Sequence, residues 1–127
     1  MGKIIQIVED DDDIRFILEY ILEDIAATIE TFDCIKAFKA RKRNADLLIL
    51  DVRLPDGDGI ELSKCLKTSA NTSSIPVIIM SAHANGALAI LEGKADAFIE
   101  KPFDLDRFSH KVKGILLLNG QNDIETS

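Results

Sequence analysis

Residues 47–59 read LLILDVRLPDGDG, and this stretch decides the fold. Four consecutive apolar residues run directly into Asp51, and the segment Pro55–Gly59 is rich in residues that form turns. An apolar run without polar alternation predicts a strand that is covered on both faces. The carboxylate of Asp51 is therefore expected at the end of a buried strand, and in a parallel sheet the strand ends form the ligand-binding edge.

Short apolar runs of this kind alternate with amphipathic stretches along the whole chain. The predicted strands are Ile4–Val8, Ala27–Phe32, Leu47–Leu50, Ile75–Met80 and Ala97–Ile99. The predicted helices are a stretch with apolar positions from Ile14 to Ile25, then Cys34–Arg43, Ile60–Leu66, Asn85–Leu91, and one that begins near Asp104. Asp11 or Asp12 can cap the first helix. The alternation predicts βα units that build one parallel α/β sheet.

Length and charge limit the classes of protein that this chain can represent. Its 127 residues predict one domain over residues 1–118, followed by a polar tail over residues 119–127 that is expected to fray. A net charge of −7 argues against a nucleic-acid partner, because phosphate binding needs a basic face. No apolar run approaches the ~20 residues of a membrane span and no signal peptide is evident, so we expect a cytoplasmic protein without a membrane partner. Cys34 and Cys65 have neither disulfide-framework nor metal-ligand spacing.

Polar side chains follow four of the five predicted strands. Glu9 and Asp10 come after the first strand, Asp51 after the third, Ser81 after the fourth and Lys101 after the fifth. The carboxyl ends of parallel strands lie at one edge of a sheet. Three carboxylates, a hydroxyl and an amine are therefore expected to converge there.

Carboxylates brought so close together repel one another and need a compensating cation. Mg²⁺ fits this set best, because it prefers oxygen ligands and binds through one or two carboxylates together with phosphate. These strand ends carry no His or Cys ligands that would suggest a zinc site. A carboxylate that stays ionised beside Mg²⁺ and a lysine can act as a nucleophile towards a phosphoryl group.

These motifs, in this order, resemble the receiver domain of two-component response regulators over roughly residues 3–118. The resemblance rests on Glu9-Asp10, the stretch 47–59, Ser81-Ala82 and Lys101-Pro102-Phe103. It implies a flavodoxin-like, doubly wound, five-stranded parallel sheet of order 2-1-3-4-5 with five helices. It also implies a stand-alone phosphoacceptor switch rather than an enzyme with a separate substrate. The phosphodonor would be a sensor histidine kinase or phosphotransfer protein, and the signal would pass to a downstream protein.

The resemblance implies a role for each acidic residue at the edge. Asp51 would accept the phosphoryl group, and Asp10 and Asp51 would bind Mg²⁺ directly. Glu9 would act on the metal through water, and the backbone carbonyl of Arg53 would be a further ligand. Asp11, Asp12 and Asp13 are interpreted as a solvated run that caps a helix.

The remaining site residues are implied in the same way. Lys101 would contact the phosphoryl oxygens and precede a cis peptide bond to Pro102. Ser81 would donate to the phosphoryl group, and Ser81 and Phe98 would form a switch pair that reshapes the surface of the fourth helix, fifth strand and fifth helix. Together with Asp51, Lys101 and Ser81 are the predicted catalytic residues.

The chain also departs from the family pattern. The interval from Ser81 to Phe98 is shorter than usual, which implies a clipped or shifted fourth helix, and Lys94 stands where glycine is frequent. His83 and Arg53 would tune the lifetime of the phosphorylated state, while His83 and His110 are otherwise expected at the surface. Leu116–Leu118 cannot all face inward, which suggests a partner or homodimer contact.

Three alternative functions remain open. A Mg²⁺-dependent phosphohydrolase of the haloacid-dehalogenase type would want an acid where this chain has Arg53, and a cap insertion as well. A flavin carrier would want a glycine-rich phosphate loop where this chain has acids. A receiver-like module that binds partners without being phosphorylated is the third alternative.

Overall fold

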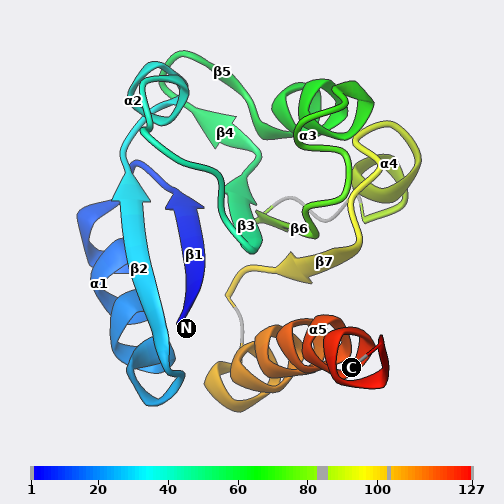
Figure 1. Cartoon of the computed structure of the whole chain (residues 1–127). Helices are drawn as coiled ribbons and strands as arrows, with labels where there is room; N and C mark the ends of the chain where they lie inside the picture. The colour runs from blue at the N-terminus through cyan, green and yellow to red at the C-terminus, as the bar shows by residue number, and fades with distance from the viewer. Residues whose placement is uncertain (1, 83–85, 103, 127) are drawn as a thin grey trace.

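The computed structural model describes residues 2–82, 86–102 and 104–126, with side chains up to residue 117. Five parallel strands form the central sheet in the order β2-β1-β3-β6-β7 (Figure 1). Their bounds are β1 Lys3–Val8, β2 Ala27–Phe32, β3 Leu47–Asp51, β6 Val77–Ser81 and β7 Ala97–Glu100. Counted along the chain without the small hairpin β4–β5, this is the predicted order 2-1-3-4-5.

Helices cover both faces of the sheet, as expected of a doubly wound fold (Figure 1). The bounds are α1 Asp12–Ile21, α2 Ile35–Lys39, α3 Gly59–Thr68, α4 Gly86–Leu91 and α5 Leu105–Thr126, with a 3₁₀ turn at Leu22–Asp24. The core cluster beneath α1 and α5 includes Leu18 and Phe108, and the opposite cluster beneath α2, α3 and α4 includes Phe38 and Leu62. The strands are therefore buried from both sides, which explains their unbroken apolar runs.

The predicted helices agree with the structure in number but not in every boundary. The second helix is α2, and it ends at Lys39 instead of Arg43. Its last predicted turn is replaced by contacts of Arg41, which lies 4.1 Å over the Phe38 ring and donates to the Phe38 carbonyl. The residues after Lys39 are mainly polar, so no apolar side chain holds a further helical turn against the sheet. Asn85, the predicted start of the fourth helix, lies outside the described residues.

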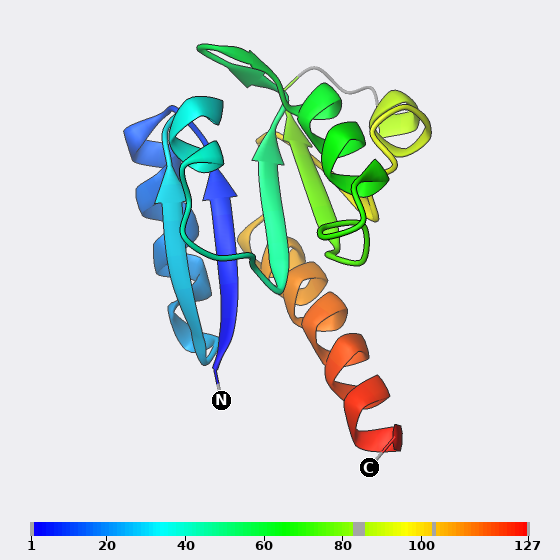
Figure 2. The same cartoon turned by 45° about the horizontal axis from the view of Figure 1, so that its top comes forward.

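Helix α5 differs from the prediction at its C-terminal end. The segment 119–126 was expected to be a frayed polar tail, but α5 continues through it to Thr126, and this end extends past the sheet (Figure 2). Once a helix has formed, each added residue contributes one backbone hydrogen bond, and no proline interrupts this segment. In the described chain, no helix is both long enough and apolar enough to cross a bilayer. The domain limit at residue 118 stays a prediction.

A small antiparallel hairpin follows β3 and was not predicted. It consists of β4 Arg53–Leu54 and β5 Gly57–Asp58, and lies above the carboxyl edge of the sheet (Figure 2). At its tip, the two carboxylate oxygens of Asp56 accept hydrogen bonds of 2.8 Å from the Ile35 amide and 2.9 Å from the Lys36 amide. These bonds satisfy two of the free amides at the start of α2. The loop after Asp51 is thereby tied to a neighbouring helix.

Lys94 adopts a backbone conformation that favours glycine. Its φ of +55° lies in the left-handed region, and the resemblance described above implies glycine at this position. Because a side chain with a Cβ is strained there, replacing Lys94 with glycine is expected to stabilise the fold by on the order of 0.5–1 kcal/mol. Urea unfolding of Lys94→Gly would measure the gain. Lys94→Ala keeps the Cβ but loses the charge, so a similar gain in that variant would contradict the backbone explanation.

Candidate functional site

The carboxyl edge of the sheet brings the predicted site residues together. Glu9 and Asp10 directly follow β1, Asp51 ends β3, Ser81 ends β6, and Lys101 directly follows β7. Ligand oxygens of Glu9, Asp10 and Asp51 lie within 4.8 Å of one another. The parallel register of neighbouring strands produces this convergence, since each strand ends at the same edge.

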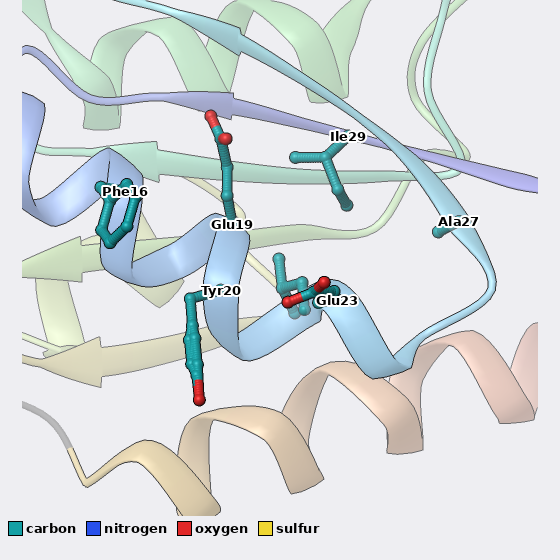
Figure 3. A pocket seen from close by; sticks show the side chains of 7 residues that line it. Phe16, Glu19, Tyr20, Glu23, Ala27 and Ile29 are labelled. Atoms are coloured by element: carbon teal, nitrogen blue, oxygen red, sulfur yellow. The ribbon is translucent and has the colours of Figure 1, made fainter.

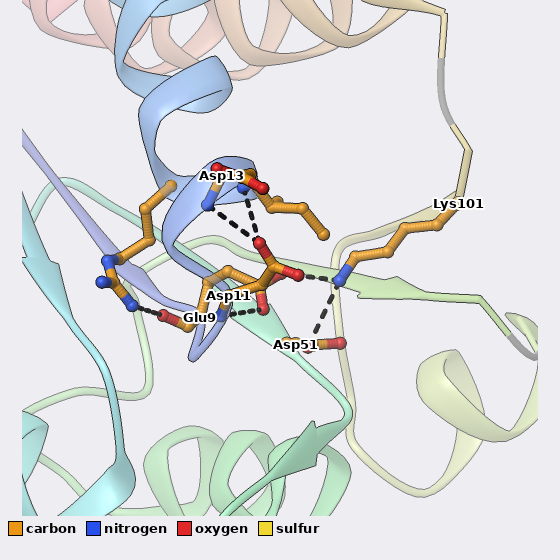
Figure 4. A network of polar contacts seen from close by, with 7 residues as sticks. Glu9, Asp11, Asp13, Asp51 and Lys101 are labelled. Atoms are coloured by element: carbon orange, nitrogen blue, oxygen red, sulfur yellow. Dashed lines mark hydrogen bonds and ion pairs between the residues drawn. The ribbon is translucent and has the colours of Figure 1, made fainter.

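Lys101 lies between two of the carboxylates (Figure 4). Its Nζ is 2.6 Å from Glu9 Oε1 and 3.3 Å from Asp51 Oδ2. The Lys101 amide also donates to the Ser81 carbonyl over 2.8 Å, which fixes the chain leaving β7. The peptide bond from Lys101 to Pro102 is cis, and this confirms the prediction. The ammonium group therefore reaches the acidic edge from a strand that is distant in sequence from Glu9 and Asp51.

Glu9 is an almost fully buried acid, with 1% of its surface exposed. Burial raises its pKa from the ordinary value of 4.5 to about 7, the hydrogen bond from Lys101 opposes this rise, and the charge of Asp51 adds to it. For Lys101, burial acts to lower the pKa, but the hydrogen bond and charge of Glu9, with the charge of Asp51, raise it overall. The lysine thus carries a positive charge that only partly compensates the three acids.

The uncompensated negative charge faces an open cleft of about 670 Å³. The cleft is lined by Glu9, Asp10, Asp11, Asp12, Asp13, Ile14, Asp51, Arg53 and Lys101. In this part of the described chain, the side chains that can ligate a metal offer only carboxylate oxygens. Hard oxygen donors on a surface open to water are what Mg²⁺ prefers, whereas a zinc site would use nitrogen or sulfur ligands. The donor set therefore fits Mg²⁺.

Asp51 is 7% exposed and begins a tightly folded loop. The Val52 amide donates to the Met80 carbonyl over 3.1 Å, and the Gly59 amide donates back to the Val52 carbonyl over 2.8 Å. A Cβ on Gly59 would lie 1.9 Å from the Asp51 carbonyl oxygen. Only glycine permits this close approach. The backbone of Asp51 is therefore held in place by Gly59, which directly follows the β4–β5 hairpin.

The other predicted residues lie at or near the edge with different exposures. Ser81 is buried at the end of β6, and Phe98 is half-buried on β7 and packs against the core cluster beneath α2, α3 and α4. Arg53 is exposed and lines the cleft. The roles predicted for Ser81, Phe98 and Arg53 stay predictions.

Some residues that the sequence singled out do not line the cleft, and others lie outside the described residues. His83 lies outside the described residues, and His110 is exposed on α5. The Cys34 Sγ accepts a hydrogen bond from the Ala37 amide over 3.4 Å at the start of α2, and Cys65 is exposed. Within the predicted contact Leu116–Leu118, Leu116 is buried in the core and Leu117 is 65% exposed, while the side chain of residue 118 is outside the described set.

The contacts of Arg15 near the site were not predicted from the sequence. The Arg15 guanidinium donates from Nη1 to the Glu9 carbonyl over 2.7 Å, and from Nη2 to the Asp12 carboxylate. The available signal was that Arg15 is the first cation after the five-acid run Glu9–Asp13, one helical turn beyond Asp12. Sequence spacing could suggest the pair with Asp12, but not the bond to a backbone carbonyl.

The buried acid makes stability depend on pH in a specific direction. Between pH 4.5 and about 7 the folded state keeps the Glu9 proton that the unfolded chain has already released. The free energy of unfolding is therefore expected to fall as pH rises through this window, by on the order of 1–3 kcal/mol in metal-free buffer. Urea unfolding of the wild type and Glu9→Gln across pH 4–8 would isolate this contribution, since other titrations cancel in the difference. Parallel stability curves for the two proteins would contradict it.

A doubly wound domain with this edge, including a lysine before a cis proline, has the architecture of a receiver domain. The family model described as response regulator receiver domain matches residues 5–113. The chain belongs to this family, and the predicted resemblance is confirmed.

Two curated relatives show the range of proteins that contain such a domain. The chain is 32% identical over 134 residues to the phosphate regulon transcriptional regulatory protein PhoB of Pseudomonas aeruginosa, and the match covers 98% of this chain and 56% of PhoB. It is also 32% identical over 120 residues to the polar-differentiation response regulator DivK of Brucella ovis, and this match covers 91% of this chain and 98% of DivK. The chain thus spans about half the length of PhoB but nearly all of DivK.

Solved structures agree with these relatives. The non-phosphorylated HemR receiver domain from Leptospira biflexa has a TM-score of 0.79 and 29% identity, and the match covers 91% of this chain and 94% of that one. The response regulator DrrB from Thermotoga maritima has a TM-score of 0.84 and 26% identity, and the match covers 94% of this chain and 54% of that one. Both likenesses support the fold described above.

Proposed function

We propose that this receiver domain is a phosphoacceptor switch in which Asp51 takes a phosphoryl group from the phosphohistidine of a sensor histidine kinase or phosphotransfer protein. The observation that carries the proposal is the pairing of Asp51 with Lys101, 3.3 Å apart, beside two further carboxylates at the edge of an open cleft. A purely structural acid would have no need of two acidic neighbours that repel it. The same arrangement suits a nucleophile that is held ionised.

The transfer step balances with the groups that are available. A carboxylate oxygen of Asp51 attacks the phosphorus of phosphohistidine, and a P–O bond forms as the P–N bond breaks. The electron pair of the broken bond returns to the imidazole nitrogen, and the product is an acyl phosphate on Asp51. Water later hydrolyses this acyl phosphate to restore the carboxylate and release inorganic phosphate, so the domain resets itself without a separate substrate.

Asp10 and Asp51 would hold Mg²⁺ directly, with Glu9 acting through water and the Arg53 carbonyl as a further ligand. When bound, Mg²⁺ would neutralise negative charge on the phosphoryl oxygens. Lys101 would turn its ammonium group from the Asp51 carboxylate to a phosphoryl oxygen while keeping its bond with Glu9. The Ser81 hydroxyl would donate to another phosphoryl oxygen.

Phosphorylation would be read out on the surface formed by α4, β7 and α5. Ser81 ends β6 directly beside β7, where it is aligned with Glu100, and Phe98 lies on the same neighbouring strand. Gly86 of α4 lies against the Phe98 ring, since a Cβ there would be 3.0 Å from a ring carbon. Movement of Ser81 towards a phosphoryl group would therefore reach α4 through Phe98, and a downstream protein would recognise the change.

The phosphodonor would dock along α1. Asp12 and Asp13 begin this helix and line the cleft, so a partner that covers the cleft must contact α1. Beyond them Phe16 and Tyr20 are 73% and 64% exposed, beside a groove that also contains Glu19 and Glu23 (Figure 3). Exposed aromatic rings flanked by acids suit a partner surface with apolar and basic side chains.

Incubation with Mg²⁺ and acetyl phosphate, followed by intact-mass measurement, tests the proposal. The expected result is one added phosphoryl group that is lost slowly and is not formed when Mg²⁺ is chelated. Continuous release of phosphate without a stable adduct would favour the phosphohydrolase. Absence of any adduct under conditions in which Mg²⁺ binds would favour the module that is not phosphorylated, and a yellow chromophore would favour the flavin carrier.

A further inference from the structure

Glu9 has a partner for each of its polar groups. Its amide donates to the Phe32 carbonyl over 3.0 Å, and its two carboxylate oxygens accept from Lys101 Nζ over 2.6 Å and from the Asp11 amide over 3.2 Å. Its carbonyl oxygen accepts from Arg15 Nη1 over 2.7 Å. Two of these partners, in Phe32 and Asp11, are backbone groups, and a third is Lys101, to which a catalytic role is already proposed. Arg15 is the partner that the proposed chemistry has not used.

The Arg15 side chain is held against the loop at the end of β1. Only 19% of it is exposed, although Arg15 lies in the first turns of a surface helix. One arm of the guanidinium reaches back to the Glu9 carbonyl and the other binds the Asp12 carboxylate. A planar fork with several donors can hold both partners at once, which a single ammonium group does less well.

Asp10 is the residue whose position depends on these contacts. It is exposed, and in the described part of the chain no side chain holds its carboxylate directly. Glu9 on one side is fixed as above, and Asp11 on the other side caps α1 by accepting from the Asp13 and Ile14 amides over 2.9 and 3.1 Å. The direction of the Glu9 carbonyl sets the plane of the peptide that leads into Asp10.

We infer that Arg15 is a positioning residue for the metal-binding loop: by holding the Glu9 carbonyl it aims the Asp10 carboxylate into the cleft. The inference rests on the proposed function, because it assigns Asp10 to Mg²⁺. Arg15 also binds Asp12, and it is Asp10 rather than Asp12 that lies with Glu9 and Asp51 in the group whose ligand oxygens are within 4.8 Å of one another.

A positioning role and a purely electrostatic effect of Arg15 predict opposite changes in Mg²⁺ affinity when Arg15 is replaced. A guanidinium close to the cleft repels a divalent cation, so on charge alone its removal would tighten Mg²⁺ binding. Positioning predicts that removal weakens binding, because an exposed ligand with a free backbone must be ordered each time the metal binds. Loss of a group that orients a metal ligand typically lowers metal affinity by about 10-fold or more.

The test is calorimetric titration of Mg²⁺ alone into metal-free protein, without any phosphodonor. Arg15→Gln is expected to bind Mg²⁺ about 10-fold more weakly than the wild type. Arg43→Gln is the matched control, since it removes the same charge from a residue that binds Glu30 and does not line the cleft. This control is expected to leave Mg²⁺ affinity unchanged or slightly higher.

Arg15→Lys provides a second variant in case Arg15→Gln folds poorly. Lysine keeps the charge that repels the cation, so any recovery of Mg²⁺ affinity over Arg15→Gln must come from its hydrogen bond to the Glu9 carbonyl. Partial recovery is expected. Amide hydrogen exchange in the metal-free state gives an independent readout, and exchange at Asp11 is expected to be faster in Arg15→Gln than in the wild type.

The outcomes distinguish failure of the positioning role alone from failure of the proposed function. If wild-type protein binds Mg²⁺ and forms the adduct, but Arg15→Gln binds Mg²⁺ as tightly or more tightly, the positioning role is wrong and the switch stands. If Arg15→Lys binds no better than Arg15→Gln, the positioning role is also wrong. If the wild type itself takes up no Mg²⁺, the proposed function fails together with the inference.

Discussion

Replacement of Asp51 with asparagine is expected to abolish formation of the phosphoryl adduct, with a loss of roughly 10³-fold or more in the rate of uptake. Asparagine has nearly the same shape as aspartate, but its amide is a poor nucleophile and carries no charge to attract Mg²⁺. Lys101 would keep its 2.6 Å bond to Glu9 in this variant, so the fold should be retained. Intact mass after incubation with Mg²⁺ and acetyl phosphate would measure the loss.

Asp33 offers a matched control for this experiment. It is an exposed aspartate directly after β2, and it does not line the cleft. Asp33→Asn therefore makes the same chemical change at the end of another strand, which β1 separates from β3, and it should form the adduct as the wild type does. An adduct on Asp51→Asn at a comparable rate would show that the phosphoryl group is carried elsewhere.

A methyl group at Gly59 is expected to have the largest effect on stability. The added Cβ would lie 1.9 Å from the Asp51 carbonyl oxygen and 2.8 Å from its carbonyl carbon. Both atoms belong to the backbone and cannot rotate away, so the loop between Asp51 and α3 would have to open. We expect Gly59→Ala to lose more than about 3 kcal/mol of unfolding free energy in urea, and to lose adduct formation as Asp51 shifts.

Replacement of Gly114 with alanine is the control for Gly59→Ala. A Cβ there would meet no atom within 4 Å apart from its chain neighbours and the backbone of its own helix, and the residue lies inside α5. Alanine should favour the helical backbone at this position and raise stability by about 0.5–1 kcal/mol. If both glycine variants changed stability by similar small amounts, the close approach at Gly59 would have no energetic consequence.

Much of the fold could be predicted because it depends on short-range features of the chain. The unbroken apolar run Leu47–Leu50 indicates a strand buried on both faces, and β3 begins at its first residue and ends one residue beyond its last. β2 coincides with the predicted Ala27–Phe32. The strand ends also located the candidate site, because Glu9, Asp51 and Ser81 directly follow predicted apolar runs, and Asp10 and Lys101 lie one residue further along. The receiver family and the strand order are confirmed.

Helix ends were less predictable. The polar stretch after Lys39 and the polar segment 119–126 have similar local character, yet α2 stops before the first and α5 continues through the second. At α2 the chain must return to begin β3, and Arg41 binds the Phe38 carbonyl instead of extending the helix. Within the described residues, α5 leads to no further strand, so its backbone need not turn back to the sheet. The difference depends on the surroundings of each segment rather than on its composition.

The sequence by itself determined which residues end the buried strands, because an apolar run followed by an acid or a hydroxyl is a property of neighbours along the chain. Only the tertiary structure decided how those residues are held: the burial that raises the pKa of Glu9, the capping of α2 by Asp56, and the bond from Arg15 to the Glu9 carbonyl. These contacts join residues through space, and their geometry depends on how closely helices and loops pack against the sheet.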